Sequence, residues 1–302
     1  MNNIVFFGTE DFSLITLRAL VEANLPVAAV VTKPDSPKGR GHHLTQPIVK
    51  IYASEHDIPV WQPTKLSEIT DNIKALNNPV GVLVSFGKII PQSIIDLFDP
   101  GIINVHPSRL PKYRGPSPIE TAILNGDKET AVSIMQLSAA MDAGPVYGYA
   151  PLDLTGTETR AELYDRLGEL GAQTLLRLLP LIMNGEVTGQ PQDDSSASYC
   201  KLISKTDGLI DWNKPALQIQ REIRAYAGWP QSRTTLGGID VIIISAQVKS
   251  GAAAPGEVVI NGNELTVGTA ENLLSIDIIK PLGKKEMPIS AFLSGHRSQL
   301  ID

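Results

Sequence analysis

The first half of the chain alternates short, continuously apolar runs with amphipathic stretches. Asn3–Phe7, Val27–Thr32, Val80–Ser85 and Ile102–Val105 have the pattern of buried strands, and Phe12–Ala23, with leucines at helical spacing, separates the first two. Strands that are apolar on both faces and alternate with helices are typical of a parallel sheet covered on both sides. We therefore expect an α/β, Rossmann-like domain whose active crevice lies beyond the carboxyl ends of its strands.

The second half of the chain follows a different pattern. After a helical segment at Ala216–Tyr226, several short strand-like runs occur between Ile239 and Ile279, separated by glycine and asparagine. Such runs predict a small antiparallel sheet or an open, OB-like barrel. Since 302 residues exceed the usual size of one core, we predict an N-terminal domain at 1–188, a linker at 189–204 and a C-terminal domain at 205–302.

Composition limits the classes of protein that fit. A hydrophobic content of 42% suits a folded chain, and no run approaches the ~18 apolar residues of a membrane helix. The apolar start lacks the basic region of a signal peptide, and a single cysteine, Cys200, excludes an internal disulfide. These features favour a cytoplasmic protein, and nothing demands more than a monomer. The net charge of −6 argues against a general nucleic-acid coat protein.

Asn104, His106 and Asp142 are the candidate catalytic residues. Strand alternation places Asn104 and His106 on one side of the chain, about 6.5 Å apart. An amide can stabilise a developing oxyanion, an imidazole can carry a proton, and a carboxylate can orient and charge-balance that imidazole. These groups are the ones needed to move an acyl unit between two nitrogens. For the two strand residues alone, a pair of satisfied polar side chains at a strand end is an equally good interpretation.

The run from Ser108 to Ile119 makes a family resemblance specific. It has the pattern Ser-x-Leu-Pro-x-Tyr-Arg-Gly-x-x-Pro-Ile, follows an Asn-x-His and precedes a Met-Asp-x-Gly. In these motifs, and over nearly its whole length, the chain resembles the folate-dependent formyltransferases, and among them those that act on methionyl-tRNA. The resemblance implies an enzyme that transfers the formyl group of 10-formyltetrahydrofolate to the amino group of initiator methionyl-tRNA in translation initiation, without a metal.

The resemblance also implies roles for individual residues. Asn104 would donate to the developing oxyanion, His106 would be a second donor or a proton carrier, and Asp142 would stay ionised beside the imidazole. The folate cleft would be lined by a short run after the strand, in which an arginine stands where the family usually has leucine. The members of that run are Ser108, Arg109, Leu110 and Pro111.

A long connection at Lys33–Lys50 is the candidate tRNA contact. It carries four Lys/Arg residues against one Asp and is rich in glycine and proline, which suits a loop that meets phosphates. The resemblance implies that it reaches the tRNA acceptor stem through Arg40, with Lys38 beside it, and that the domain at 205–302 also binds tRNA. Composition alone favours a surface loop with solvated charges.

Other functions stay open. The same trio would serve a formyltransferase that acts on a sugar-nucleotide amine or another small amine, or a hydrolase that releases formate. A nucleotide-binding oxidoreductase is disfavoured because Gly8 is the one glycine between Phe7 and Leu14, so the Gly-x-Gly-x-x-Gly spacing is missing. A catalytically silent tRNA-binding module is the third class.

Overall fold

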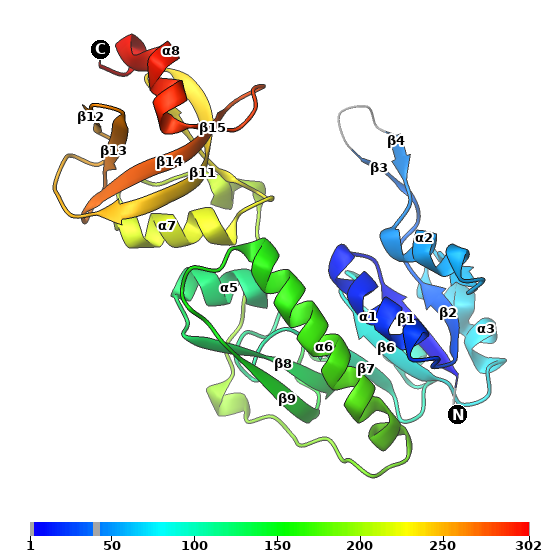
Figure 1. The fold of residues 1–302 in the computed structure, drawn as a ribbon. Coiled ribbons are helices and arrows are strands. Elements are labelled where there is room, and N and C mark those ends of the chain that lie inside the picture. The colour runs from blue at the N-terminus through cyan, green and yellow to red at the C-terminus, as the bar shows by residue number, and fades with distance from the viewer. Residues whose placement is uncertain (1–2, 39–42, 302) are drawn as a thin grey trace. The chain divides into compact units, whose positions relative to one another are not determined.

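The computed structural model describes residues 3–38 and 43–301, and the chain forms two compact units (Figure 1). The N-terminal unit comprises Met1–Pro118, Glu129–Asp153 and Tyr164–Cys200. The C-terminal unit comprises Ile119–Lys128, Leu154–Leu163 and Lys201–Asp302. Both units contain segments from distant parts of the sequence, and the domain boundaries expected above stay a prediction.

The N-terminal unit is built on a seven-stranded sheet with the order β5-β2-β1-β6-β7-β8-β9. The first five of these strands are parallel, and β8 and β9 continue the sheet in antiparallel pairing. The α/β class with a mostly parallel sheet is therefore confirmed. The strands are β1 (Ile4–Gly8), β2 (Val27–Val31), β5 (Val60–Trp61), β6 (Val80–Val84), β7 (Ile102–His106), β8 (Glu129–Gln136) and β9 (Val146–Asp153).

Helices cover this sheet on both faces, as the continuously apolar strands require. Phe12 of α1 packs edge-to-face on Tyr164 of α6, with ring centroids 5.6 Å apart. The other face of the sheet packs Val5 and Phe7 against residues of α3 and α4. The helices are α1 (Asp11–Glu22), α2 (Ile48–Glu55), α3 (Thr70–Lys74), α4 (Gln92–Ile95) and α6 (Arg160–Met183), and the 3₁₀ turn η1 (Leu66–Ile69) precedes α3.

The connection at 33–50 folds into a small hairpin. Strands β3 (Ser36–Lys38) and β4 (His43–Thr45) pair antiparallel, with Lys38 opposite His43. Residues 39–42, which include Arg40, lie outside the described residues. Helix α2 follows directly, so the expected long loop is a hairpin and the start of a helix.

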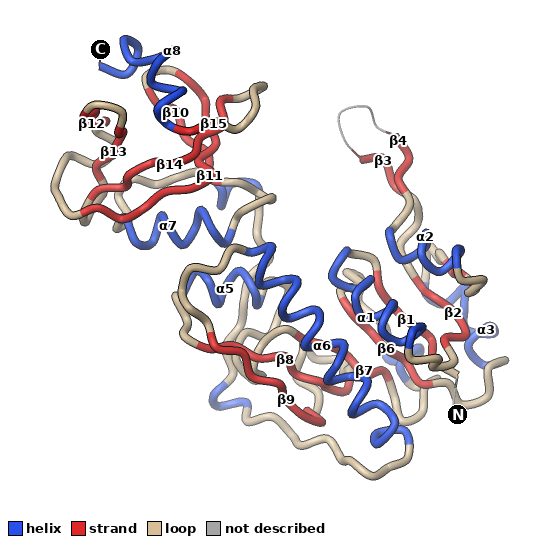
Figure 2. Tube along the Cα trace, in the orientation of Figure 1, coloured by secondary structure: helices blue, strands red, loops and turns tan. Residues whose placement is uncertain are grey.

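The C-terminal unit contains an antiparallel sheet with the order β10-β11-β14-β13-β12, and β15 pairs with β14. This order leaves β10 and β12 at the edges, so the expected small antiparallel sheet is confirmed. Figure 2 distinguishes its strands from the helices. The elements are α5 (Pro118–Asn125), the 3₁₀ turn η3 (Lys205–Gly208), α7 (Ala216–Ala225), β10 (Ser232–Leu236), β11 (Ile239–Lys249), β12 (Val258–Asn261), β13 (Glu264–Gly268), β14 (Leu273–Pro281), β15 (Met287–Pro288) and α8 (Ile289–Ile301). The 3₁₀ turn η2 (Asp194–Ser196) belongs to the N-terminal unit.

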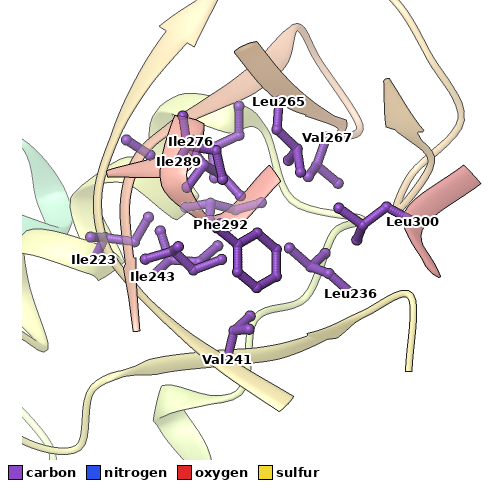
Figure 3. Packing of buried hydrophobic residues seen from close by; sticks show 14 of the residues in the cluster. Ile223, Leu236, Val241, Ile243, Leu265, Val267, Ile276, Ile289, Phe292 and Leu300 are labelled. Atoms are coloured by element: carbon purple, nitrogen blue, oxygen red, sulfur yellow. The ribbon is translucent and has the colours of Figure 1, made fainter. Parts of the chain in front are cut away.

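One hydrophobic core holds the C-terminal unit together. Phe292 of α8 is fully buried at its centre, among Val241, Ile243 and Leu236 of the sheet (Figure 3). Ile223 of α7 contributes to the same core. Across the described parts of both units, no helix combines the length and apolarity needed to cross a membrane.

Candidate active site

Strand β7 carries two polar side chains on one face. Asn104 and His106 are only 5% and 4% exposed. Val105, between them, points to the opposite face, where a methyl group at Gly171 of α6 would collide with it. Close packing of α6 therefore fixes the rotation of β7 and directs Asn104 and His106 together to the other face.

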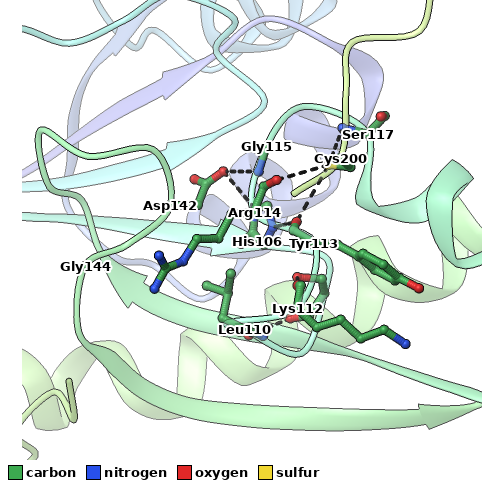
Figure 4. A network of polar contacts seen from close by, with 12 residues as sticks. His106, Leu110, Lys112, Tyr113, Arg114, Gly115, Ser117, Asp142, Gly144 and Cys200 are labelled. Atoms are coloured by element: carbon green, nitrogen blue, oxygen red, sulfur yellow. Dashed lines mark hydrogen bonds and ion pairs between the residues drawn. The ribbon is translucent and has the colours of Figure 1, made fainter. Parts of the chain in front are cut away.

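The segment 137–145, here called the acid loop, brings Asp142 to that face. It begins where Leu137 donates to the carbonyl of Ile102 at 2.7 Å. From there it returns toward the carboxyl end of β7, because Oδ2 of Asp142 lies 3.8 Å from Nδ1 of His106. The same oxygen accepts a hydrogen bond from the backbone N–H of Gly115 at 2.8 Å (Figure 4). The structure thus brings the predicted acid and imidazole together.

Hydrogen bonding assigns the proton of the imidazole. Nε2 of His106 lies 3.0 Å from the carbonyl oxygen of Tyr113. A carbonyl can only accept, so Nε2 carries a proton and donates it. Nδ1 is the ring nitrogen that faces Asp142. Within residues 3–38 and 43–301, the Asn104 amide makes no hydrogen bond, so its NH₂ group is available to a ligand.

The four residues predicted to line the folate cleft lie in different environments. Ser108 is buried, donates to the carbonyl of Lys112 at 2.6 Å and accepts at its own carbonyl from Ser133. Leu110 is also buried, whereas Pro111 is half-buried. Arg109 is exposed, with its guanidinium 6.0 Å from the ring centroid of Tyr149. Ser108 and Leu110 therefore support the loop from inside, and Arg109 is the charged member that a ligand can reach.

A surface hollow borders the start of the acid loop. Gln92, Ile95 and Phe98 line it on one side, and Gln136–Ala139 line it on the other. Pro100 and Gly101, which precede β7, also line it, so the hollow lies at the amino end of this strand.

Sequence reasoning missed two residues that support this site. Arg114 is 2% exposed, and its guanidinium donates to Gln192 at 3.0 Å and to Asp194 at 2.7 Å. Gln192 in turn donates to the carbonyl of Asp142 at 2.8 Å. Arg114 lies inside the Tyr-Arg-Gly motif, which was a usable signal. Gln192 lies in a polar stretch that gave no sign of its contacts.

Cys200 lies beside the site, and its surroundings do not suit a nucleophile. It is buried, and its Sγ accepts from the backbone N–H of Ser117 at 3.2 Å. Burial raises the pKa of this thiol, so it stays protonated at neutral pH. In the described ranges, no group of three or more His, Cys, Asp or Glu side chains is placed to hold a metal ion.

Of the two residues predicted to contact tRNA, the structure describes one. Lys38 is the last residue of β3, and Arg40 lies outside the described residues. Their role in tRNA binding stays a prediction.

Sequence comparisons define the family to which this site belongs. The family model described as "Formyl transferase" matches residues 1–179, and the model described as "Formyl transferase, C-terminal domain" matches residues 202–297. The chain therefore belongs to the formyl transferase family, as the motifs around Asn104 and Asp142 indicated.

One named relative and two solved structures are similar to the chain over most of its length. A protein of Geobacter sulfurreducens named methionyl-tRNA formyltransferase is 38% identical over 297 residues, which are 97% of this chain and 94% of that one. A solved N-formyltransferase of Helicobacter canadensis, in complex with folinic acid and dTDP-3-aminofucose, has a TM-score of 0.70 at 19% identity, over 93% of this chain and 100% of that one. HypX of Aquifex aeolicus, in complex with tetrahydrofolic acid, has a TM-score of 0.63 at 18% identity, over 96% of this chain and 46% of that one. At such identities, the two solved structures establish the shared fold alone.

Proposed function

We propose that this formyltransferase transfers the formyl group of 10-formyltetrahydrofolate to the amino group of initiator methionyl-tRNA. The observation that carries the proposal is the convergence of Asn104, His106 and Asp142 on one face of β7, with His106 Nδ1 3.8 Å from Asp142 Oδ2. The choice of acceptor rests on the name of the Geobacter sulfurreducens relative, to which the chain is similar over nearly its full length.

The three side chains match the needs of the transfer. When the amine attacks the formyl carbon, negative charge develops on the formyl oxygen and the amine nitrogen gains a surplus proton. The free NH₂ of Asn104 is suited to donate to that oxygen, a contribution of about 2.7–4 kcal/mol for one such donor. Nδ1 of His106 can take the proton and return it to the departing folate nitrogen, while Asp142 balances the imidazolium charge. No covalent bond to the protein is needed.

The folate co-substrate belongs to the same proposal. The two solved neighbours bound to folinic acid and tetrahydrofolic acid share this fold. Ser108, Arg109, Leu110 and Pro111 are proposed to shape the cleft, with direct ligand contact assigned to Arg109. No metal is assigned a step.

The tRNA partner is proposed to meet the hairpin that carries Lys38 and Arg40, together with the C-terminal domain at 205–302. A cytoplasmic location and a monomeric state are part of the proposal, and sedimentation of the purified chain tests the second.

A substrate comparison tests the proposed function. The purified chain is supplied with 10-formyltetrahydrofolate and, in separate reactions, with charged initiator tRNA, a UDP-aminosugar and glycinamide ribonucleotide. We expect rapid formylation of the tRNA and little transfer to the small amines. Formylation of the aminosugar without formylation of the tRNA would overturn the assigned acceptor, and release of formate alone would indicate a hydrolase.

A further inference from the structure

The side-chain amide of Gln192 connects two parts of the site. Its Nε2 donates to the backbone carbonyls of Asp142 and Gly144, at 2.8 and 2.7 Å. Its Oε1 accepts from Nε of Arg114 at 3.0 Å. Both N–H donors and the carbonyl oxygen are therefore engaged, which fixes the orientation of the amide.

Arg114, which donates to the Gln192 oxygen, is buried and makes several further hydrogen bonds. The Arg114 guanidinium is 2% exposed and also donates to Asp194 at 2.7 Å and to the hydroxyl of Tyr199 at 3.3 Å. Its backbone N–H donates to Ser198, and its carbonyl accepts from Cys200, both at 2.8 Å. The burial of Arg114 and the hydrogen bonds on both sides of its backbone hold its Nε against the Gln192 oxygen.

The backbone of the acid loop adopts a conformation that persists only when neighbouring groups hold it. Asp142 has a φ of +47°, in the left-handed region that residues other than glycine rarely adopt and that persists only where surrounding contacts hold it. Gly144 runs against the carbonyl of Gln136, so that no side chain fits there (Figure 4 shows the path of the loop). The carboxylate end of Asp142 is held by Gly115, next to Arg114, and the backbone end by Gln192.

We propose that Gln192 is a positioning residue, which holds the acid loop so that the Asp142 carboxylate stays beside His106. This inference rests on the proposed function, since it assumes that Asp142 serves the transfer. Gln192 does not touch the reacting atoms. It acts through the backbone of Asp142 and Gly144, with Arg114 as its support.

A pair of matched variants tests this role. Gln192→Leu removes both donors, and Gln190→Leu alters an exposed glutamine two residues earlier, whose side-chain amide donates to the carbonyl of Thr188 at 3.4 Å. Since two hydrogen bonds to the loop are lost, we expect Gln192→Leu to lower kcat roughly 10- to 100-fold, with the KM for each substrate unchanged within about twofold. Gln190→Leu should match the wild type. Gln192→Glu, which keeps the acceptor for Arg114 but presents oxygen to both carbonyls, should lower kcat in the same way.

A double-mutant cycle separates positioning from general damage. If Gln192 acts through Asp142, Gln192→Leu should cost less than about twofold further once Asp142→Asn is present. Equal losses in both backgrounds, a rise in both KM values, or a Gln192→Leu enzyme equal to Gln190→Leu would overturn the inference. If Asp142→Asn itself kept wild-type kcat, the proposed role of Asp142 would fail first, which distinguishes the two failures.

Discussion

Nδ1 of His106 lies 3.8 Å from Oδ2 of Asp142, in a site where the same carboxylate oxygen is held by the backbone N–H of Gly115 at 2.8 Å. A separation of 3.8 Å is too long for a hydrogen bond and short enough for a strong interaction between charges. The Asp142 carboxylate would therefore interact weakly with a neutral imidazole and more strongly with an imidazolium. The carboxylate is therefore placed to balance the charge of the imidazolium that the proposed transfer creates.

The first prediction concerns the coupling of these two residues. His106→Ala should lower the single-turnover rate of formyl transfer by about 10²–10⁴, the usual contribution of a positioned proton carrier. Asp142→Asn should lower it less, and the double variant should be about as slow as His106→Ala, because the acid acts on the imidazole. Rapid-quench measurements with saturating substrates test this, and simply additive losses would show that Asp142 acts on something else.

The second prediction concerns Cys200. Burial raises the pKa of its thiol, so we expect slow alkylation of the native protein at pH 7 and fast alkylation after unfolding. Cys200→Ser should keep formyl transfer within about threefold of the wild type, since no step of the proposal uses the thiol. A folded Cys200→Ser protein without transfer activity would give the cysteine a role that the structure does not suggest.

The third prediction concerns Arg40, in the segment between β3 and β4. Arg40→Ala should raise the KM for tRNA far more than the KM for folate and should reduce the slope of log affinity against log salt by about one. Lys74→Ala, at the end of α3, is the matched control for loss of one exposed positive charge. Equal changes in both KM values for Arg40→Ala would contradict a contact to tRNA phosphate.

The fourth prediction concerns stability in acid. Burial alone would raise the pKa of Glu158, but hydrogen bonds from Thr155 and Gly156 lower it from 4.5 to about 2. A carboxyl whose pKa falls on folding stabilises the protein above its unfolded value, and this stabilisation is lost as the pH falls from about 4.5 toward 2. Glu158→Gln should cost about 1–3 kcal/mol of unfolding free energy at pH 7. Urea denaturation at a series of pH values tests this, and a wild-type–variant gap that stays constant from pH 6 to pH 2.5 would refute it.

Much of the fold could be predicted from the sequence, because the core strands are short and apolar throughout. β1, β2, β6 and β7 and the helix α1 occur where their patterns indicated, within one or two residues at each end. Strands β8 and β9 were missed, although they complete the sheet beside β7. In β9, exposed and buried residues alternate only weakly, so its sequence has no clear strand pattern. The C-terminal helix α8 was also missed, because it buries only a few side chains, such as Phe292, and so has no strong helical pattern.

The site could be predicted only where local geometry determines it. The alternation of a strand places Asn104 and His106 on one face, and the family motif points to Asp142. Gln192 had no such signal, since its bonds reach residues 48, 50 and 78 positions away in the sequence. Contacts of that range depend on the tertiary path of the linker, which no local pattern specifies.

The rate of formyl transfer by Asn104→Ala is the most direct test of the proposed chemistry. Asn104 is 5% exposed, and within the described residues its side-chain amide makes no hydrogen bond. If it donates to the developing oxyanion, Asn104→Ala should lower the single-turnover rate with charged initiator tRNA by about 10²–10³ and leave tRNA and folate affinity nearly unchanged. A transfer rate within a few-fold of the wild type, measured on folded protein, would contradict the account.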